Sequence, residues 1–218
     1  MQNNDYCKVS VATFDKLADQ YAAKYFDLRL YDRYLERFAK CIDAPGASVL
    51  DVACGPGNVS GYLAKIRPDL KLLGIDLAEG MLRQARLRVP GVEFLQKDCR
   101  RIDELGCVFD AAAFAFGLSY LTDSDAEQFL VSLNAALTDS ATFYLSTITG
   151  ESSQSGFEVT GSGDRIYIEY RSVSAVTTMV QRAGYRIEFM DVLQSPDNAS
   201  KVTQDLILIG KRAERNDP

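Results

Sequence analysis

A carboxylate, two glycines and the start of a helical pattern lie close together near residue 50. Residues 49–52 form an apolar run that contains Asp51, and Gly55 and Gly57 follow in a short loop before the helical pattern begins. Glycine lets the backbone approach a ligand where a Cβ atom would collide, and the first N–H groups of a helix have no partner inside the helix. A strand–glycine loop–helix junction is therefore typical of a site for a nucleotide-like ligand at the carboxyl end of a parallel sheet.

Two more carboxylates follow apolar, strand-like runs further along the chain. Asp76 follows residues 70–75 and stands 25 residues after Asp51, and Asp98 follows residues 92–97. In doubly wound folds an acidic residue at the tip of the second strand binds the hydroxyls of a ribose. The ordered series predicts a nucleoside-binding site rather than unrelated surface acids.

These motifs resemble those of class I S-adenosylmethionine-dependent methyltransferases. Residues 50–57 (LDVACGPG) are similar to the first motif of the family, an acidic residue followed by a glycine-rich loop, with Ala53 in place of the first glycine. Residues 73–82 (LGIDLAEGML) resemble its second strand and the start of the next helix, and residues 109–121 fall where its fourth strand opens toward the methyl donor. The resemblance covers about residues 10–212.

The resemblance implies S-adenosylmethionine as cofactor and S-adenosylhomocysteine as product. Asp51 would face the ammonium group directly or through water, and Asp76 would accept hydrogen bonds from both ribose hydroxyls. Asp98 would accept from the adenine amino group while the Cys99 N–H serves a ring nitrogen. The residues expected to bind the cofactor are Tyr21, Tyr25, Asp51, Ala53, Cys54, Gly55, Gly57, Asp76, Leu77, Met81, Asp98, Cys99, Ala115 and Phe116.

Three tyrosines lie in the N-terminal segment that folds over the cofactor in similar enzymes. Tyr21, Tyr25 and Tyr31 could bind the carboxylate of the methionine part, or could offer a ring face to the sulfonium cation. The alternative for each is a place in an apolar packing stripe. Tyr21 and Tyr25 are the two that we expect in such a lid.

A dinucleotide-dependent oxidoreductase and a non-catalytic protein are the alternative hypotheses. The run from Gly55 to Ser60 fits the G-x-G-x-x-G/A spacing with serine at the third small position. Asp51 and Asp98 favour the methyltransferase, because a pyrophosphate gains nothing from a carboxylate at Asp51. A regulatory protein that binds the cofactor without transferase activity stays open, because the acceptor side of the site has no recognisable motif.

The composition is that of an ordinary globular protein, and it excludes several other classes. The 218 residues are 47% hydrophobic, and the net charge of −6 argues against a nucleic-acid partner. The chain has no histidine, the usual metal ligand and general base, so no metal site is expected. No apolar run is long enough for a membrane span, and no signal peptide is evident.

The five cysteines form an odd set without paired metal-binding spacing, and they are expected as free thiols in a reducing cytoplasm. We expect a monomer or a homodimer. The cysteines are Cys7, Cys41, Cys54, Cys99 and Cys107.

Strand-like and helical patterns alternate along the chain and predict one α/β domain. The resemblance implies a Rossmann-like, doubly wound sheet of about seven strands, mostly parallel with an antiparallel C-terminal strand, in three α/β/α layers. Within the single domain 1–218 the expected parts are an N-terminal helical lid (1–44), a cofactor-binding core (45–148), a loop and hairpin that could cap the acceptor (149–172), and C-terminal helix and strands (173–212). The expected elements in the outer parts are helices at 11–25, 30–41 and 174–183, strands at 165–171, 186–193 and 203–211, and a frayed tail at 212–218.

The acceptor is expected to be a small molecule, attacked through oxygen, nitrogen, sulfur or carbon. The Asn/Asp-Pro-Pro-Tyr motif associated with methylation of amino groups of bases and glutamine is absent after the fourth strand, which ends Ala115-Phe116-Gly117-Leu118. Methyl transfer from an activated donor mainly requires alignment and exclusion of water. No catalytic residue is assigned from the sequence.

Overall fold

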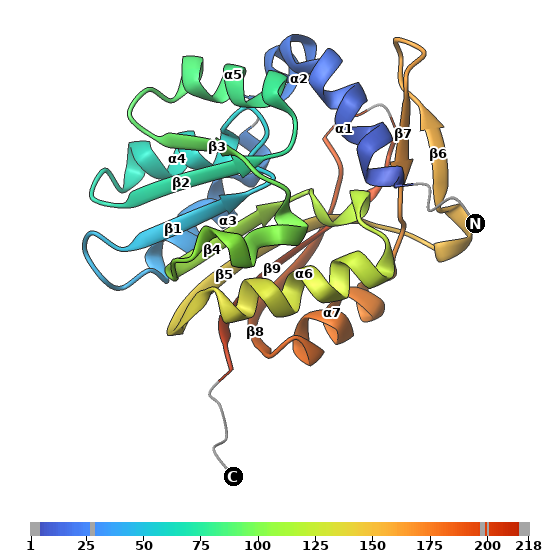
Figure 1. The fold of residues 1–218 in the computed structure, drawn as a ribbon. Coiled ribbons are helices and arrows are strands. Elements are labelled where there is room, and N and C mark those ends of the chain that lie inside the picture. Colours follow the sequence, from blue (N-terminus) through green and yellow to red (C-terminus); the bar gives the residue numbers. More distant parts are fainter. Residues whose placement is uncertain (1–4, 27–28, 197–198, 200, 214–218) are drawn as a thin grey trace.

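A single seven-stranded sheet with helices on both faces forms the body of the molecule (Figure 1). The computed structural model describes residues 5–26, 29–196, 199 and 201–213, so most of the expected tail lies outside the described residues. The strands of the sheet are β1 (Ser48–Val52), β2 (Lys71–Asp76), β3 (Glu93–Gln96), β4 (Phe109–Ala115), β5 (Leu137–Thr149), β8 (Tyr185–Gln194) and β9 (Gln204–Arg212). A separate two-stranded sheet consists of β6 (Gly156–Val159) and β7 (Arg165–Ile168).

Seven α-helices and four short 3₁₀ turns connect these strands in the described part of the chain. The α-helices are α1 (Tyr6–Lys16), α2 (Ala18–Tyr25), α3 (Asp32–Lys40), α4 (Asn58–Ile66), α5 (Glu79–Arg88), α6 (Asp123–Ala135) and α7 (Val173–Arg182). The 3₁₀ turns are η1 (Arg29–Tyr31), η2 (Cys99–Leu105), η3 (Leu118–Tyr120) and η4 (Ser152–Gln154).

The strand order is β3-β2-β1-β4-β5-β9-β8, and only β9 runs antiparallel to its neighbours. The order reverses between β1 and β4, because successive strands are added outward in one direction from β1 to β3 and in the other from β4 to β5. In open α/β sheets a crevice for ligands opens at such a reversal, outside the carboxyl ends of the strands. The predicted fold is confirmed, including the antiparallel C-terminal strand.

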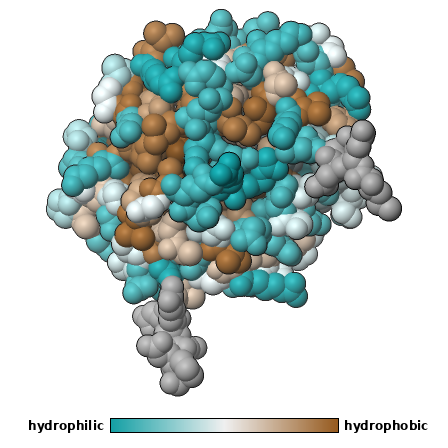
Figure 2. Space-filling model, viewed as in Figure 1, coloured by the Kyte–Doolittle hydropathy of each residue, from teal (hydrophilic) through white to brown (hydrophobic). Residues whose placement is uncertain are grey.

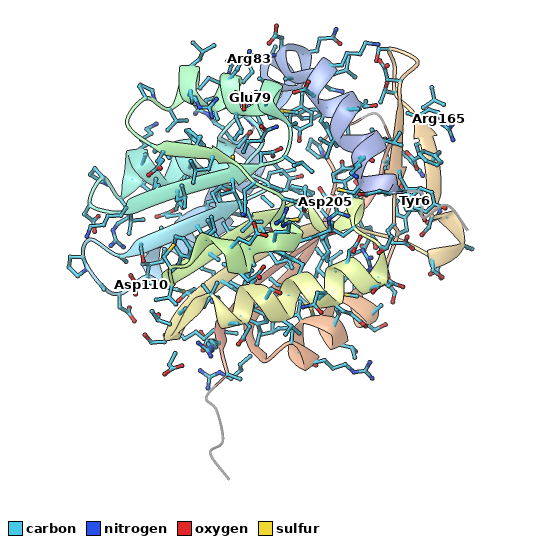
Figure 3. The ribbon with its side chains drawn as sticks, in the orientation of Figure 1. Tyr6, Glu79, Arg83, Asp110, Arg165 and Asp205 are labelled. Atoms are coloured by element: carbon cyan, nitrogen blue, oxygen red, sulfur yellow. The ribbon has the colours of Figure 1, made fainter. Side chains whose placement is uncertain are left out.

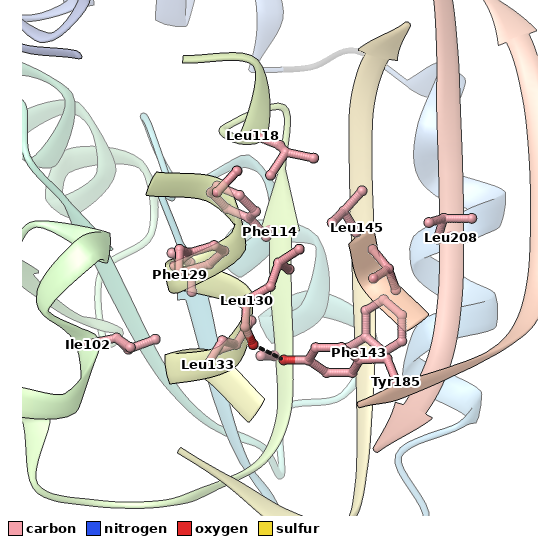
Figure 4. Close-up of a cluster of buried hydrophobic side chains, with 14 of the residues drawn as sticks. Ile102, Phe114, Leu118, Phe129, Leu130, Leu133, Phe143, Leu145, Tyr185 and Leu208 are labelled. Atoms are coloured by element: carbon pink, nitrogen blue, oxygen red, sulfur yellow. Dashed lines mark hydrogen bonds between the residues drawn. The ribbon is translucent and has the colours of Figure 1, made fainter. Parts of the chain in front are cut away.

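Alternate residues of the central strands face opposite helical layers. Ala111 and Ala113 of β4 pack in a cluster with α3 and α4, whereas Ala112 and Phe114 pack with α6 and α7. Figure 4 shows the second cluster, where the rings of Phe114 and Phe129 lie 4.5 Å apart between their centroids. This two-sided burial explains why the strands read as continuous apolar runs rather than as an alternation.

The N-terminal segment forms two helices where the sequence pattern predicts one. A break at Leu17 separates α1 from α2, and α1 begins at Tyr6, five residues before the predicted start. Asp5 caps this earlier start through its side chain, which accepts a hydrogen bond from the Lys8 N–H. The apolar periodicity across residues 11–25 does not reveal the break, because each of the two helices buries one face and the pattern continues from one to the next.

Helices α1 and α2 are fixed to the core by polar contacts at their inner faces. Asp15 accepts a hydrogen bond of 2.5 Å from the Gly80 N–H, and it thereby caps α5, whose preceding residue Ala78 provides no side-chain cap. Asn58, the first residue of α4, donates from its side-chain amide to the Tyr25 carbonyl at 2.6 Å. The N-terminal helices therefore cover the helices that follow β1 and β2.

The β6–β7 hairpin extends the cover made by α1, and the two lie side by side in Figure 1. Thr13 donates a hydrogen bond of 2.6 Å to the Arg165 carbonyl, and the Tyr167 N–H donates to Ser10 Oγ at 2.9 Å. Segments that are about 150 residues apart in the chain therefore form one wall over the carboxyl edge of the sheet.

The face of the molecule shown in Figure 2 is a mosaic of hydrophilic side chains and separate apolar areas. Across the described ranges, every helix is too short or too polar to span a bilayer.

We predict that Gly80→Ala loosens the N-terminal helices. An added Cβ would lie 2.4 Å from the Asp15 carbonyl oxygen, so α1 must move, and overpacking of this kind costs about 1–3 kcal/mol. Urea unfolding should show this loss, and limited proteolysis should cleave faster within residues 5–26. The matched helical variant Gly61→Ala, whose Cβ meets only side chains at 3.2 Å or more, should stay within about 1 kcal/mol of the wild type. Equal behaviour of the two variants would contradict the close approach at Gly80.

Candidate functional site

Two adjoining cavities open at the carboxyl edge, where the strand order reverses. The smaller has a volume of about 110 Å³ and the larger about 990 Å³. They share part of their lining, so a ligand that fills the smaller one borders directly on the larger. The shared residues are Phe14, Tyr21, Ala53, Gly55, Ala115, Phe116 and Tyr120.

Strained backbone at the ends of β1 and β4 shapes the junction between the cavities. Ala53 has a φ of +50° and Phe116 a φ of +59°, a left-handed conformation that costs non-glycine residues roughly 1–3 kcal/mol. The Gly55 φ is +55°, and a Cβ atom there would meet nothing within 4 Å, so this glycine borders open space. The chain thus bends sharply at both strand ends and leaves its backbone exposed to a ligand.

The Asp51 carboxylate is buried within the sheet, and only 1% of the residue is exposed. Its Oδ2 accepts hydrogen bonds from the Ser60 N–H at 3.0 Å and the Ser60 hydroxyl at 2.6 Å, whereas its Oδ1 has no hydrogen-bond partner. Burial raises the pKa of Asp51 to about 7, against the opposing effect of the bonds from Ser60. Asp51 lines the larger cavity, so a cation bound there would lie near a carboxylate that lacks one hydrogen-bond partner.

The Asp76 carboxylate joins the glycine-rich loop to the next helix. Its Oδ2 accepts from the Gly55 N–H at 2.9 Å, and its Oδ1 accepts from the Ala78 N–H at 2.8 Å. Burial raises its pKa despite these backbone bonds. Each carboxylate oxygen has a second lone pair, and Asp76 lines the smaller cavity, so both oxygens remain available to hydroxyl donors there.

Asp98 lines the same cavity but is engaged by an arginine. Arg100 donates to both carboxylate oxygens, with its Nη2 2.6 Å from Oδ2, and burial is outweighed so that the pKa of Asp98 lies below its usual value. Arg100 also binds Asp5 at 3.2 Å through two nitrogens and so connects the adenine end of the predicted site to the start of α1. Cys99 lines the cavity beside Asp98, and burial raises the pKa of its thiol well above the usual value.

Aromatic rings close the side of the cavities that faces the N-terminal helices. Tyr21 packs against Tyr25, with ring centroids 4.8 Å apart, and against Phe14 at 5.7 Å. Tyr120 in η3 meets Phe14 at 4.9 Å, and burial raises its pKa above the usual value. Burial also raises the pKa of Tyr21, to about 12, so this hydroxyl stays protonated at neutral pH.

The structure brings nearly all of the sequence-predicted residues together. Ten of them line the smaller cavity, namely Tyr21, Ala53, Gly55, Asp76, Leu77, Met81, Asp98, Cys99, Ala115 and Phe116. Tyr25, Asp51 and Cys54 line the larger one. Gly57 lines neither; it starts α4 with a φ of +88°, and its Cβ position is 3.1 Å from the Val89 side chain.

Several lining residues carry no recognisable signal in the sequence. Phe14 and Tyr120 form the aromatic wall, and Thr203 and Asp205 reach the larger cavity from the start of β9. From the sequence alone, an acid at the beginning of the last predicted strand is expected on the surface. The topology shows instead that β9 begins at the carboxyl edge of the sheet, where the cavities lie.

The residues present fit S-adenosylmethionine on two observations. The orphaned Oδ1 of Asp51 meets the need of an ammonium group for a negative partner, and the open space beside Gly55 admits a ligand against the backbone. Within the residues that the structure describes, no cluster of three or more acidic or cysteine side chains is arranged to hold a metal ion.

The strand order, the single antiparallel strand and the cavities at the reversal define the fold of class I S-adenosylmethionine-dependent methyltransferases. Residues 49–140 match the family model described as "Methyltransferase domain". The matched segment begins in β1 and ends in β5, and it contains the glycine-rich loop and both Asp76 and Asp98.

Curated relatives share short segments with this chain. A trans-aconitate 2-methyltransferase of Methylobacterium nodulans is 47% identical over 55 residues, which is 25% of this chain and 21% of that protein. A demethylmenaquinone methyltransferase of Symbiobacterium thermophilum is 38% identical over 80 residues, which is 35% of this chain and 32% of that protein. The matches thus span about a fifth to a third of these relatives.

Solved structures share the fold over nearly the whole chain. The complex of DhpI with S-adenosylhomocysteine has a TM-score of 0.71 at 19% identity and covers 98% of this chain and 100% of that chain. The 1,6-didemethyltoxoflavin-N1-methyltransferase of Burkholderia thailandensis, solved with 1,6-didemethyltoxoflavin and S-adenosylhomocysteine, has a TM-score of 0.71 at 16% identity. It covers 98% of this chain and 92% of that chain.

We predict that Asp51 makes the unliganded protein less stable as the pH rises. Its folded pKa of about 7 lies above the usual 3.8, so the protonated form favours folding, and stability falls between about pH 4 and pH 7. Asp51→Asn should remove this pH dependence, which changes the free energy of unfolding by about 4 kcal/mol at most across the range. Urea unfolding of both proteins across this range measures the difference, in which contributions from other acids cancel.

Asp110→Asn is the control for this measurement. Hydrogen bonds from Ser48 lower the pKa of Asp110, so its contribution has the opposite sign and is lost below about pH 4. Parallel curves for the wild type and Asp51→Asn would contradict the raised pKa.

Proposed function

We propose that this protein is an S-adenosylmethionine-dependent methyltransferase that methylates a small-molecule acceptor. The observation that carries the proposal is the buried, half-paired Asp51 carboxylate in the lining of the larger cavity, together with the open Gly55 backbone where the two cavities adjoin. The donor supplies a methyl group that is already activated by a positive sulfur, so the protein must mainly bind, align and exclude water.

The residues of the smaller cavity would hold the nucleoside part. Asp76 would accept from the ribose hydroxyls, Met81 and Leu77 would pack beside the adenine, and Asp98 with the Cys99 N–H would serve the adenine edge. Because Arg100 already occupies much of the Asp98 carboxylate, we propose that Asp98 contributes one acceptor at most. Asp51 would attract the ammonium group.

The N-terminal helices and the β6–β7 hairpin would enclose the acceptor. We propose residues 1–44 as a lid and 149–172 as an acceptor cap, because α1 is bonded to β7 and both border the larger cavity. Tyr21 and Tyr25 would close over the methionine part. A reducing cytoplasm belongs to the proposal, since the five cysteines are free thiols.

The two alternative functions fit the glycine-rich loop and the cavities less well than a methyltransferase does. In a dinucleotide site the glycine-rich loop would face a pyrophosphate, and the unpaired Asp51 oxygen would repel it. A regulatory protein that binds the cofactor without turnover would need no second cavity, whereas the larger one here measures about 990 Å³.

Isothermal titration with S-adenosylmethionine, S-adenosylhomocysteine, NAD and NADP tests the proposal. We expect micromolar binding of the first two only, and Asp76→Ala should weaken it by about 2 kcal/mol because polar groups lose their partner. Asp110→Ala is the control, since Asp110 lies at the opposite edge of the sheet, as Figure 3 shows. Binding of NAD or NADP instead would contradict the proposal, and equal affinity of wild type and Asp76→Ala would remove Asp76 from the site.

The ammonium partner can be tested separately by counting protons. Near pH 7 about half of the Asp51 side chains carry a proton, and a bound ammonium favours the ionised form, so S-adenosylmethionine should release up to about half a proton per site. Calorimetry in buffers of different ionisation enthalpy measures this release. Methylthioadenosine keeps the ribose and adenine but lacks the ammonium, so it should release none, and neither ligand should release a proton from Asp51→Asn. Equal release by the two ligands would contradict the role of Asp51.

A further inference from the structure

A tyrosine–aspartate pair faces the larger cavity from segments that the methyl-donor site does not use. The Tyr31 hydroxyl, in η1, donates a hydrogen bond of 2.6 Å to Asp205 Oδ2, in β9. Both residues line the larger cavity, and the Tyr31 ring lies 5.1 Å from the ring of Phe116 at the cavity junction. The pair therefore stands beside the point where the end of β4 meets both cavities.

The antiparallel direction of β9 explains why an acid lies here. Asp205 is paired with Ile148 near the end of β5, so the start of β9 lies at the carboxyl edge with the ends of the parallel strands. Figure 3 shows Asp205 in the interior of the molecule, and its exposure is only 2%. Among the described residues, Asp205 receives side-chain hydrogen bonds from Tyr31 and Thr203.

Tyr31 can relay a proton from an acceptor in the cavity to Asp205. The Tyr31 hydroxyl gives its hydrogen to Asp205, so its oxygen lone pairs are left to accept from a group in the cavity. Burial raises the pKa of both groups. Tyr21 from α2 and Tyr144 from β5 also act on Tyr31, and burial raises the pKa of both of these tyrosines as well.

We propose that Tyr31 is a catalytic residue and Asp205 the positioning residue and proton acceptor for methylation of an aromatic hydroxyl group. The inference rests on the proposed function and names its acceptor class. The acceptor O–H bond breaks as its proton passes to Tyr31, and Tyr31 passes its own proton to Asp205. The acceptor oxygen bonds to the methyl carbon, and the electron pair of the broken carbon–sulfur bond stays on sulfur. Asp205 afterwards releases the proton to water.

The surroundings of the pair favour an aromatic hydroxyl over other acceptors. Rings and branched aliphatic side chains that line the same cavity would contact both faces of a flat acceptor. A carboxylate acceptor would be repelled by the charge of Asp205. A phenol must lose a proton to be methylated, which the pair accepts. The apolar neighbours in the cavity are Phe116, Tyr120, Ile148, Ile166 and Ile168.

The chain contains a matched pair that serves as control. Tyr34 donates to Asp191 Oδ2, also at 2.6 Å, from the neighbouring helix α3 to β8. Neither residue lines either cavity. Variants Tyr34→Phe and Asp191→Asn therefore remove a tyrosine–aspartate hydrogen bond of the same length without touching the site.

The first readout is the colour of bound 4-nitrophenol, which absorbs visible light largely as its anion. The measurement is made in slightly alkaline buffer without methyl donor. Because the charge of Asp205 excludes a second negative charge, the probe should bind to the wild type as the neutral phenol, with uptake of about one proton. Binding should therefore remove the visible absorbance, which is called bleaching below. Asp205→Asn should bind the probe without bleaching, and Asp191→Asn should bleach like the wild type. Absence of bleaching by wild type, or its loss in Asp191→Asn, overturns the proposal.

The second readout is S-adenosylhomocysteine formed from S-adenosylmethionine and phenol. Tyr31→Phe and Asp205→Asn should each lower kcat by about 100-fold with little change in KM, the size expected for loss of general-base catalysis. Tyr34→Phe should match the wild type, and thermal unfolding should show that all variants are folded. Unchanged kcat in Tyr31→Phe overturns the relay. Cofactor binding with no turnover of phenol overturns the acceptor class and leaves the proposed function standing, whereas failure to bind the cofactor overturns the proposed function itself.

Discussion

The hydrogen bonds accepted by the Asp76 carboxylate are the interaction on which the geometry of the site depends. One oxygen holds the Gly55 N–H in the loop after β1, and the other holds the Ala78 N–H at the start of α5. A single half-buried side chain thus positions two turns that belong to different β–α units. Because an unpaired buried carboxylate is costly, these bonds persist only while the two turns stay in register. The loop geometry and the carboxylate proposed to bind the ribose are therefore set together.

Small residues make the central sheet compatible with a charge in its middle strand. Asp51 of β1 stands beside Gly74 of β2 and Ala113 of β4, so neither neighbour crowds the carboxylate. A Cβ at Gly74 would lie 2.4 Å from the Phe94 ring, which packs over this position instead. The sheet thereby keeps its apolar packing on both faces while one acid remains half-paired at the cavity, as a site for a cationic group requires.

The fold and the donor side of the site could be predicted because they depend on local patterns. The apolar runs near Asp51, Asp76 and Asp98 predict three strands and the edge of the sheet at which a ligand binds. The glycine-rich loop predicts the turn that follows the first of these strands. Gly57 was placed in the site by the same motif; in the structure it lines neither cavity and precedes α4 in a left-handed conformation. Sequence spacing alone does not separate a glycine that borders a ligand from one that turns the chain.

The acceptor side escaped the sequence because distant segments build it. The sequence identified Tyr31 only as one of several N-terminal tyrosines. Asp205 can be placed at the cavity only from the antiparallel direction of β9. The Arg100 contact with Asp5 likewise joins residues 95 positions apart. Such pairings follow from tertiary packing, and no period or cap signals them. The break at Leu17 was missed for the opposite reason, since the apolar period continues through it.

The position of β9 also orders the assembly of the molecule during synthesis. A growing chain contains β5 and β8 before β9 exists, yet these two strands meet only through β9, which inserts between them. Until then β5 presents an unpaired edge, and β8 with α7 has no sheet to join. Completion of the sheet is thus delayed until β9 is synthesised. The same event brings Asp205 to Tyr31, so the acceptor side of the site forms only when the sheet closes.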